Sequence, residues 1–261
     1  MSIKYLDENR TLFNDLLAIS SQYLVDRPYL VGGIIRNHLL NASILDRDID
    51  LTTNSSECIR LGILFSAKKS ASFKIFEDKH LRVFYDGTGI DFSPGVLMNS
   101  HPGVKEWVLQ NAPDKISYCE AYSRDFTINS MHQDIETGKI FDPTGLGIND
   151  ITSKIIRTPV PPEITIKNDP RRIFRAIKLS SQHGLSIDSA IVDYVRENTE
   201  IILNQKLTTN YMTNEINIAF EGNKELAMSN IFDLGLFKLI PLSGLYSEYL
   251  IKNKMLSKYL S

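Results

Sequence analysis

The chain has 261 residues, 43% of them hydrophobic and 23% charged, a composition typical of a globular protein rather than a disordered chain or a fibre. With 29 Lys and Arg against 31 Asp and Glu, the net charge of −2 excludes an evenly basic surface that binds nucleic acid by charge alone. Two cysteines are too few for a disulfide scaffold or a zinc site of four thiolates. With no signal-peptide pattern and no run approaching the ~20 apolar residues of a membrane span, we expect a cytoplasmic protein without a membrane partner.

The first half of the chain alternates helical and strand patterns. Apolar residues spaced three and four apart indicate helices, and short β-prone runs bounded by turn residues indicate strands. The predicted elements are a helix at 7–24, a strand at 28–31, a helix at 34–41, a strand at 48–52, a helix at 55–69 and a hairpin of strands at 81–85 and 89–92. This order predicts a mixed α/β part.

The second half becomes helical after a stiff connector. The predicted elements are a short helix around Trp107, a helix at 120–135, a strand at 140–141, and helices at 171–182, 188–203, 209–220 and 223–239. Three prolines between positions 159 and 162 restrict the backbone before the helical run. The pattern predicts two domains, an α/β domain at residues 1–155 and an all-helical domain at residues 156–261.

Two aspartates share one face of the strand predicted at 48–52. Asp48 and Asp50 are two positions apart, and such residues point to the same side of a strand. Adjacent carboxylates repel each other unless a cation binds them, and Mg²⁺ prefers oxygen ligands. The alternative is a pair of solvated acids, because an isolated Asp-x-Asp is a weak signal.

A glycine pair precedes these acids in the chain. Gly32-Gly33 lies between a predicted strand and a predicted helix, where missing side chains let a phosphate approach the backbone and the first N–H groups of the helix. Arg36, one turn later, can add a charge-assisted contact. A plain tight turn followed by a surface arginine fits the same residues.

Asp91 lies between two apolar residues in the second strand of the predicted hairpin. It is either the solvent-facing residue of an edge strand or a third metal ligand. Three carboxylates can hold two Mg²⁺ ions in the arrangement used for in-line displacement at phosphorus.

Four motifs follow one another over roughly residues 29–180. They are Gly32-Gly33-Ile-Ile-Arg36 with Asp48-Ile-Asp50-Leu, then Arg124-Asp-Phe-Thr-Ile-Asn129, then Asp142-Pro-Thr-Gly145 through Ile155-Ile-Arg157, then Asp169-Pro-Arg-Arg172-Ile-Phe-Arg175. Together they resemble the tRNA nucleotidyltransferases and bacterial poly(A) polymerases, the class II branch of the polymerase-β-like superfamily. The resemblance implies an α+β fold: a nucleotidyltransferase head, built from a small mixed sheet with flanking helices, followed by an all-helical neck and body.

The resemblance also implies a role for each matching residue. The implied sets are Asp48, Asp50 and Asp91 for the catalytic Mg²⁺, Gly32, Gly33 and Arg36 for the triphosphate, Arg124, Asp125 and Asn129 for ribose and phosphates, and Asp169 and Arg172 for the base edge, with Arg175 counted as nucleotide-binding. A carboxylate accepts from the exocyclic amine that adenine and cytosine share, and a guanidinium donates to the ring acceptor beside it. Such a pair imitates a base-pairing partner without a template.

The chain departs from the family's pattern inside these motifs. Asn168 replaces a Glu before Asp169, Ser123 replaces the first Arg of the second motif, and Asn37 follows Arg36 where Asp is common. The aspartates of the family's metal site are kept, so we still expect nucleotidyl transfer. The choice between ATP alone and both CTP and ATP is left open.

The implied activity is that of a Mg²⁺-dependent, template-independent RNA nucleotidyltransferase. It would transfer AMP, and CMP as well in a CCA-adding enzyme, from NTP to an RNA 3′-hydroxyl with release of pyrophosphate. Its acceptor would be tRNA for a CCA- or A-adding enzyme and other RNA for a poly(A) polymerase. Two alternatives stay open: a stand-alone nucleotidyltransferase that modifies a small molecule or a protein, and an inactive module that binds RNA or nucleotide. The sequence does not indicate the oligomeric state.

Overall fold

The computed structural model describes residues 4–42, 48–53, 55, 57–76, 80–94, 102–203 and 207–260. The chain forms two compact units, Met1–Ile151 and Thr152–Ser261. The division falls slightly before the domain boundary expected between residues 155 and 156, and the roles of the units as head and body stay a prediction. Within the described ranges, no helix is long and apolar enough to cross a membrane.

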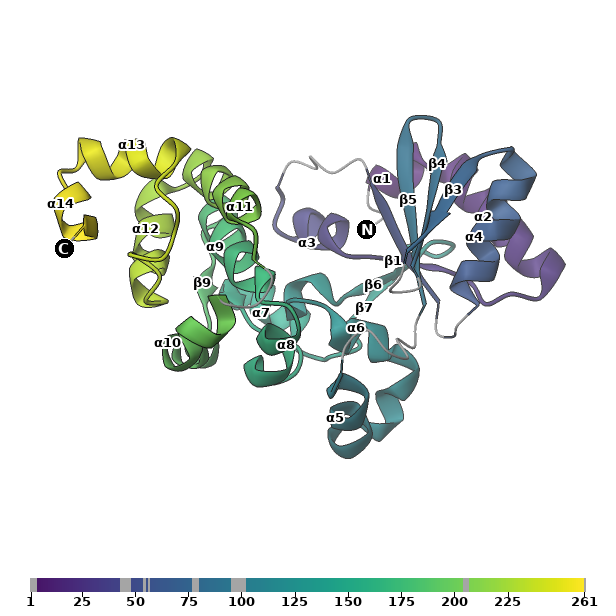
Figure 1. The fold of residues 1–261 in the computed structure, drawn as a ribbon. Helices are drawn as coiled ribbons and strands as arrows, with labels where there is room; N and C mark the ends of the chain where they lie inside the picture. Colours follow the sequence, from purple (N-terminus) through teal and green to yellow (C-terminus); the bar gives the residue numbers. More distant parts are fainter. Residues whose placement is uncertain are drawn as a thin grey trace. The chain divides into compact units, whose positions relative to one another are not determined.

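The first unit is built on a seven-stranded mixed sheet in the order β3-β4-β5-β2-β1-β6-β7 (Figure 1). Its strands are β1 Tyr29–Val31, β2 Ile49–Thr52, β3 Ser72–Ile75, β4 Leu81–Tyr85, β5 Thr88–Ser93, β6 His132–Asp134 and β7 Ile140–Phe141. Neighbouring strands pair antiparallel, except that β2 and β5 run parallel. This parallel pair brings two strands that are about forty residues apart in sequence side by side.

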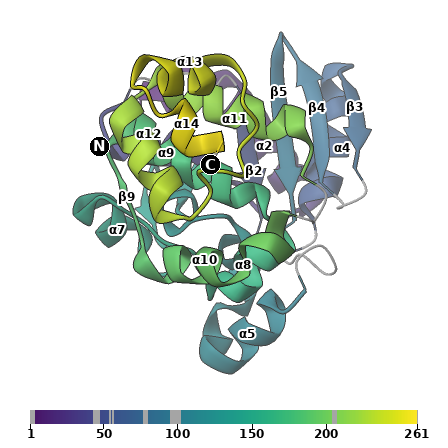
Figure 2. The ribbon, with the colours of Figure 1, turned by 60° about the vertical axis from the view of Figure 1, so that its left-hand side comes forward.

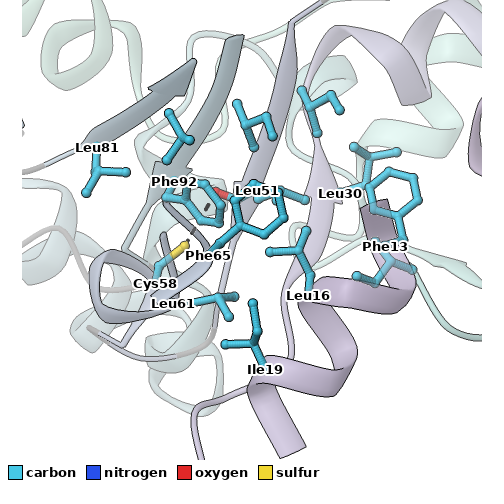
Figure 3. Close-up of a cluster of buried hydrophobic side chains, with 14 of the residues drawn as sticks. Phe13, Leu16, Ile19, Leu30, Leu51, Cys58, Leu61, Phe65, Leu81 and Phe92 are labelled. Carbon is cyan, nitrogen blue, oxygen red and sulfur yellow. Dashed lines mark hydrogen bonds between the residues drawn. The ribbon is translucent and has the colours of Figure 1, made fainter. Parts of the chain in front are cut away.

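Helices of the first unit flank this sheet. They are α1 Lys4–Glu8, α2 Arg10–Tyr23, α3 Gly33–Leu39, α4 Cys58–Lys69, α5 Val104–Asn111, α6 Cys119–Ser123 and α7 Gly147–Ser153, with 3-10 turns η1 Pro113–Tyr118 and η2 Thr127–Asn129. The main core lies between α2, α4 and one face of the sheet (Figure 3). The fully buried side chains drawn there include Phe13, Leu16, Ile19, Leu30, Leu51, Leu61, Phe65, Leu81 and Phe92.

Strand alternation decides which residues face away from this core. Ile49 and Leu51 of β2, and Ile90 and Phe92 of β5, are fully buried against the helices. Because successive side chains of a strand point to opposite faces, the residues between them lie on the other side of the sheet. Burial of the apolar positions therefore places the acids of these strands on the face turned away from this core, which we call the open face.

Most predicted elements are confirmed, and the helix expected at 120–135 is wrong. The chain leaves helix α6 at Arg124, which is extended with φ −68° and ψ 166°, and continues through η2 into strand β6. The Asp125 Oδ1 accepts hydrogen bonds from the Phe126 N–H and from the Asn129 side chain, each at 2.9 Å. Such local side-chain bonds compete with helical backbone bonds.

Smaller differences include the end of one helix and added elements, among them helices α7, α8 (Pro162–Asn168) and α13 (Gly244–Lys252) and an edge strand. The helix expected at 223–239 ends at Asp233, and Gly235 follows with a φ of +72° that favours glycine. The edge strand β3 is an addition to the expected elements, because its sequence, Ser-Phe-Lys-Ile, is too short and too exposed to give a clear pattern.

The second unit is helical apart from one small sheet. Its helices are α8 Pro162–Asn168, α9 Arg171–His183, α10 Ser189–Leu203, α11 Thr209–Glu221, α12 Lys224–Asp233, α13 Gly244–Lys252 and α14 Leu256–Leu260. Helix α9 packs against α11 and α12 (Figure 2). Strands β8 Ile155–Ile156 and β9 Ser186–Ile187 pair in parallel, which amends the all-helical expectation by two short strands.

Candidate active site

Three predicted metal ligands lie on the open face of the sheet. Asp50 in β2 is the direct neighbour of Asp91 in β5 across the parallel pair. Asp48 comes just before β2, and a Cβ at Gly89 of β5 would lie 2.8 Å from its Oδ1. The side chain of Asp48 is 51% exposed, whereas that of Asp91 is 13% exposed. The structure therefore gathers three carboxylates on adjacent strands, and they differ in their access to water.

An arginine that the sequence arguments missed joins two of these acids. Arg82 of β4 is the cross-strand neighbour of Asp91. Its Nε donates to the Asp91 Oδ1 at 2.7 Å and its Nη2 to the Asp91 Oδ2 at 2.5 Å. The same Nη2 lies 3.2 Å from the Asp48 Oδ2. The guanidinium thus bridges Asp91 and Asp48.

Asp50 carries a strongly perturbed carboxyl group. Burial raises the pKa of Asp50 to about 6, the nearby charges of Asp91, Glu120 and Asp48 raise it as well, and Arg124 opposes them. Burial, the largest of these effects, and the nearby acids together outweigh the opposing effect of Arg124. A group with this balance is a candidate for binding a cation.

Gly32 brings the backbone close to the same carboxylate. A Cβ at this position would lie 2.6 Å from the Asp50 Oδ2 and 3.0 Å from the Arg124 Nη1. Gly32 also has φ +86° and ψ −150°, a conformation essentially restricted to glycine. Gly33 is the first residue of α3. Gly32 is therefore required by a close approach as well as by its backbone conformation.

Glu120 of α6 is a second residue that sequence reasoning missed. It is almost fully buried, and its Oε1 lies 2.6 Å from the Arg124 Nη2 while its Oε2 lies 3.4 Å from the His132 Nε2. Burial favours the neutral acid, but Arg124 and His132 outweigh it and hold the pKa of Glu120 at about 2. Glu120 therefore fixes the Arg124 guanidinium beside Asp50. Its position four residues before Arg124, within the helix expected at 120–135, was the signal that could have identified it.

The remaining predicted residues of the first unit form one hydrogen-bonded network. The Nη1 of Arg36 donates to the Asn129 Oδ1 at 2.6 Å, and the Asn129 Nδ2 donates to the Asp125 Oδ1 at 2.9 Å. The Nε and Nη2 of Arg36 both donate to the Asn37 Oδ1, at 3.1 and 2.8 Å. The network ties helix α3 to the segment between α6 and β6. The departure at Asn37 keeps an acceptor for Arg36.

The acids offer a suitable donor set for a divalent cation. Among the side chains that the structure describes, no three His, Cys, Asp or Glu residues are arranged to hold a metal ion as they stand. The three aspartates nevertheless supply the hard oxygen donors that Mg²⁺ prefers. The guanidinium that bridges two of them shows that this face attracts a positive charge. The residues therefore fit a divalent cation.

Asp169, Arg172 and Arg175 lie in the second unit, at the start of α9. The Asp169 carboxylate accepts three hydrogen bonds from Arg171, from Nε at 2.7 Å, from Nη2 at 2.8 Å and from the backbone N–H at 3.1 Å. Arg172 is buried, whereas Arg175 is exposed. The structure thus places Arg172 and Arg175 in α9 and Asp169 just before that helix, and their contacts with a base stay a prediction.

Comparison with known proteins finds relatives of this chain. A family model for the poly A polymerase head domain matches residues 28–157. The CCA-adding enzyme of Geobacillus sp. (strain WCH70) is 28% identical over 230 residues, which cover 82% of this chain and 50% of that enzyme. The mitochondrial CCA tRNA nucleotidyltransferase of Saccharomyces cerevisiae is 27% identical over 206 residues, 69% of this chain and 36% of that protein. The chain thus spans half or less of these curated relatives.

Solved structures agree at the level of the fold. The Thermotoga maritima CCA-adding enzyme complexed with tRNA has a TM-score of 0.68 at 20% identity, over 91% of this chain and 55% of that one. The expected fold class, a mixed sheet with flanking helices followed by a helical body, is confirmed by this likeness. The match over residues 28–157 and the relatives named above show that this chain belongs to the family of tRNA nucleotidyltransferases and poly(A) polymerases.

Proposed function

We propose that this chain is a template-independent RNA nucleotidyltransferase that transfers AMP from ATP to an RNA 3′-hydroxyl and releases pyrophosphate. The observation that carries the proposal is the carboxylate row of β2 and β5, with the Gly32 backbone and Arg124 beside Asp50. The names of the relatives support tRNA as the acceptor and CTP as a second substrate. A cytoplasmic location is part of the proposal.

The acids are proposed to hold the metal. Asp48, Asp50 and Asp91 would bind a divalent cation, and their oxygen donors favour Mg²⁺. When bound, such an ion lowers the pKa of an attacking hydroxyl and neutralises charge on the triphosphate. Asp50 suits this role because burial and the neighbouring acids disfavour its bare negative charge.

Residues around the acids are proposed to position the nucleotide. The absence of a Cβ at Gly32 lets the backbone at the start of α3 lie close to Asp50 and Arg124, where the phosphates would bind. Arg124, which Glu120 holds in place, adds a positive charge at the same point. The bonds among Arg36, Asn129 and Asp125 fix the polar groups that would contact ribose and phosphates. Preorganised groups of this kind lose little freedom when the substrate binds.

The base is proposed to be selected by residues of α9. Asp169 would accept from the exocyclic amine, and Arg172 would donate to the adjacent ring acceptor, with Arg175 as a further nucleotide contact. The Asp169 Oδ1 accepts two bonds from Arg171, whereas Oδ2 accepts one and keeps a second lone pair for a base amine. Asn168 cannot supply the negative charge that the family places there, so the preference for ATP over CTP needs direct measurement.

Transfer to defined acceptors tests the activity. Purified protein with Mg²⁺ is incubated with each α-labelled NTP and with tRNA lacking its CCA end, with generic RNA, or with no acceptor. We expect label from ATP, and from CTP if the enzyme is of the CCA-adding type, on tRNA. Long A-tracts on any RNA would assign a poly(A) polymerase instead. Replacing Mg²⁺ with Ca²⁺, or removing it with EDTA, tests whether transfer depends on Mg²⁺.

Matched variants make the result interpretable. Asp48→Ala with Asp50→Ala should abolish transfer, whereas Asp114→Ala removes an equally charged side chain that is 72% exposed and should leave transfer unchanged. Equal activity in the wild type and the double variant would refute the proposal. Label found on a protein or on a small molecule would show that this molecule, and not RNA, is the acceptor. Nucleotide binding without any transfer would support an inactive module.

A further inference from the structure

Arg82 occupies a position among the acids that metal binding does not require. It lies on the open face because Leu81 and Val83, its neighbours in β4, are fully buried on the core side. A two-oxygen contact with Asp91 and a third contact with Asp48 hold its guanidinium. Both acids belong to the proposed metal-binding set.

The contacts of Arg82 use the atoms that a metal ion would need. Both oxygens of Asp91 accept from the guanidinium, and one oxygen of Asp48 does so as well. The side chain of Arg82 is 32% exposed, so the guanidinium can move toward solvent without unfolding the sheet. Position 89 leaves room for this arrangement, since a Cβ there would lie 2.8 Å from the Asp48 Oδ1 and 3.6 Å from the Arg82 Cζ.

We propose that Arg82 is a built-in counter-ion that competes with the divalent cation for Asp91 and Asp48, and thereby weakens metal binding while it keeps the metal-free acids together. The inference rests on the proposed function, because that function assigns the metal to these acids. Before metal binds, the guanidinium offsets the repulsion between neighbouring carboxylates. When metal binds, the guanidinium gives up at least one of its acid contacts. Arg82 is a positioning residue in this scheme and need not touch substrate.

Direct measurement of metal binding tests the inference without any enzymatic assay. Mn²⁺ serves as the probe, and the free ion is quantified by its electron paramagnetic resonance signal in titrations of wild type and Arg82→Gln. We expect Arg82→Gln to bind Mn²⁺ at least about tenfold more tightly, since loss of one charge-assisted contact is worth that factor or more. The melting temperature without metal should fall in the variant, and saturating Mg²⁺ should raise it by more than in the wild type.

Two further variants serve as controls. Lys74→Gln removes the cation directly opposite Arg82 in β3, whose Nζ lies 4.8 Å from the Phe76 ring centroid, and should leave Mn²⁺ affinity unchanged. Arg82→Lys keeps the charge but cannot form the two-oxygen contact, so its affinity should fall between those of wild type and Arg82→Gln. If Arg82→Gln folds poorly, the Mn²⁺ affinity of Arg82→Lys still tests the inference.

Each outcome separates the inference from the proposed function. Equal or weaker Mn²⁺ binding in a folded Arg82→Gln would overturn the inference, while loss of binding in Asp48→Asn would still locate the ion at the proposed acids. Absence of Mn²⁺ binding in the wild type and in every Arg82 variant would overturn the inference together with the metal part of the proposed function.

Discussion

Replacement of Asp50 by asparagine should stabilise the metal-free protein even though it removes a proposed metal ligand. The Asp50 carboxyl has a pKa of about 6 in the folded protein, against an ordinary value of 3.8, chiefly because it is buried. The folded state therefore binds this proton more tightly than the unfolded state does. Stability falls as the pH rises through the window from about 4 to about 6, and the loss is complete above it.

The size of this effect follows from the two pKa values. The difference between 3.8 and about 6 corresponds to about 3 kcal/mol above pH 7. This figure already contains the favourable contribution of Arg124, which opposes the larger cost of burial. Because an asparagine side chain at this position would resemble the protonated acid, Asp50→Asn should gain up to about 3 kcal/mol at pH 8 and almost nothing at pH 4.

Urea unfolding in EDTA measures this gain. Trp107 is the single tryptophan of the chain and lies in the first unit, so its fluorescence reports on the unit that contains Asp50. Asp48→Asn makes the same change at a side chain that is 51% exposed, and should alter stability by less than about 1 kcal/mol. An Asp50→Asn protein no more stable than wild type at pH 8, or equally stabilised at pH 4 and pH 8, would refute the reasoning.

Three further predictions use the same unfolding assay together with nucleotide transfer. Gly32→Ala should lower the free energy of unfolding by about 1–3 kcal/mol, because few residues other than glycine adopt this backbone conformation and the new Cβ would lie 2.6 Å from the Asp50 Oδ2. Unchanged stability and transfer would contradict the close approach. Glu120→Gln should lower the free energy of unfolding by about 3 kcal/mol at pH 7, because Arg124 and a histidine hold the Glu120 pKa at about 2. This loss of stability should shrink as the pH falls from about 4.5 toward 2. Arg36→Lys should raise the KM for ATP more than it lowers kcat, because one ammonium cannot make the contacts that the guanidinium makes to two asparagines; an unchanged KM would contradict this.

Much of the first unit could be predicted because its signals are local. The alternation in β2, the hairpin expected at 81–92 and the glycine pair each depend on residues close together in the chain, and the structure confirms the elements that they predicted. Arg82 was predictable in principle. A two-residue turn at 86–87 pairs Tyr85 with Thr88, and counting outward pairs Arg82 with Asp91.

Other features of the site depend on contacts between distant residues. The pairing of Asp50 with Asp91 requires β2 and β5 to run parallel, and no local pattern states this. The apolar spacing after Arg124 fits a helix, whereas side-chain bonds from Asp125 decide the course of that segment. The raised pKa of Asp50 depends on burial by the whole unit, which spacing cannot convey.

The apolar side of β2 and β5 has a consequence for the evolution of the opposite side. Ile49, Leu51, Ile90 and Phe92 set the alignment of the two strands, and a slip of either strand by one residue would turn its two apolar side chains away from the core. On the opposite face, Asp91 and Asp48 add only the contact that runs through the Arg82 guanidinium. A descendant could therefore exchange Asp50 or Asp91 for another polar residue, lose transfer activity and keep the same sheet. Selection on chemistry and selection on folding act here on opposite faces of the same two strands.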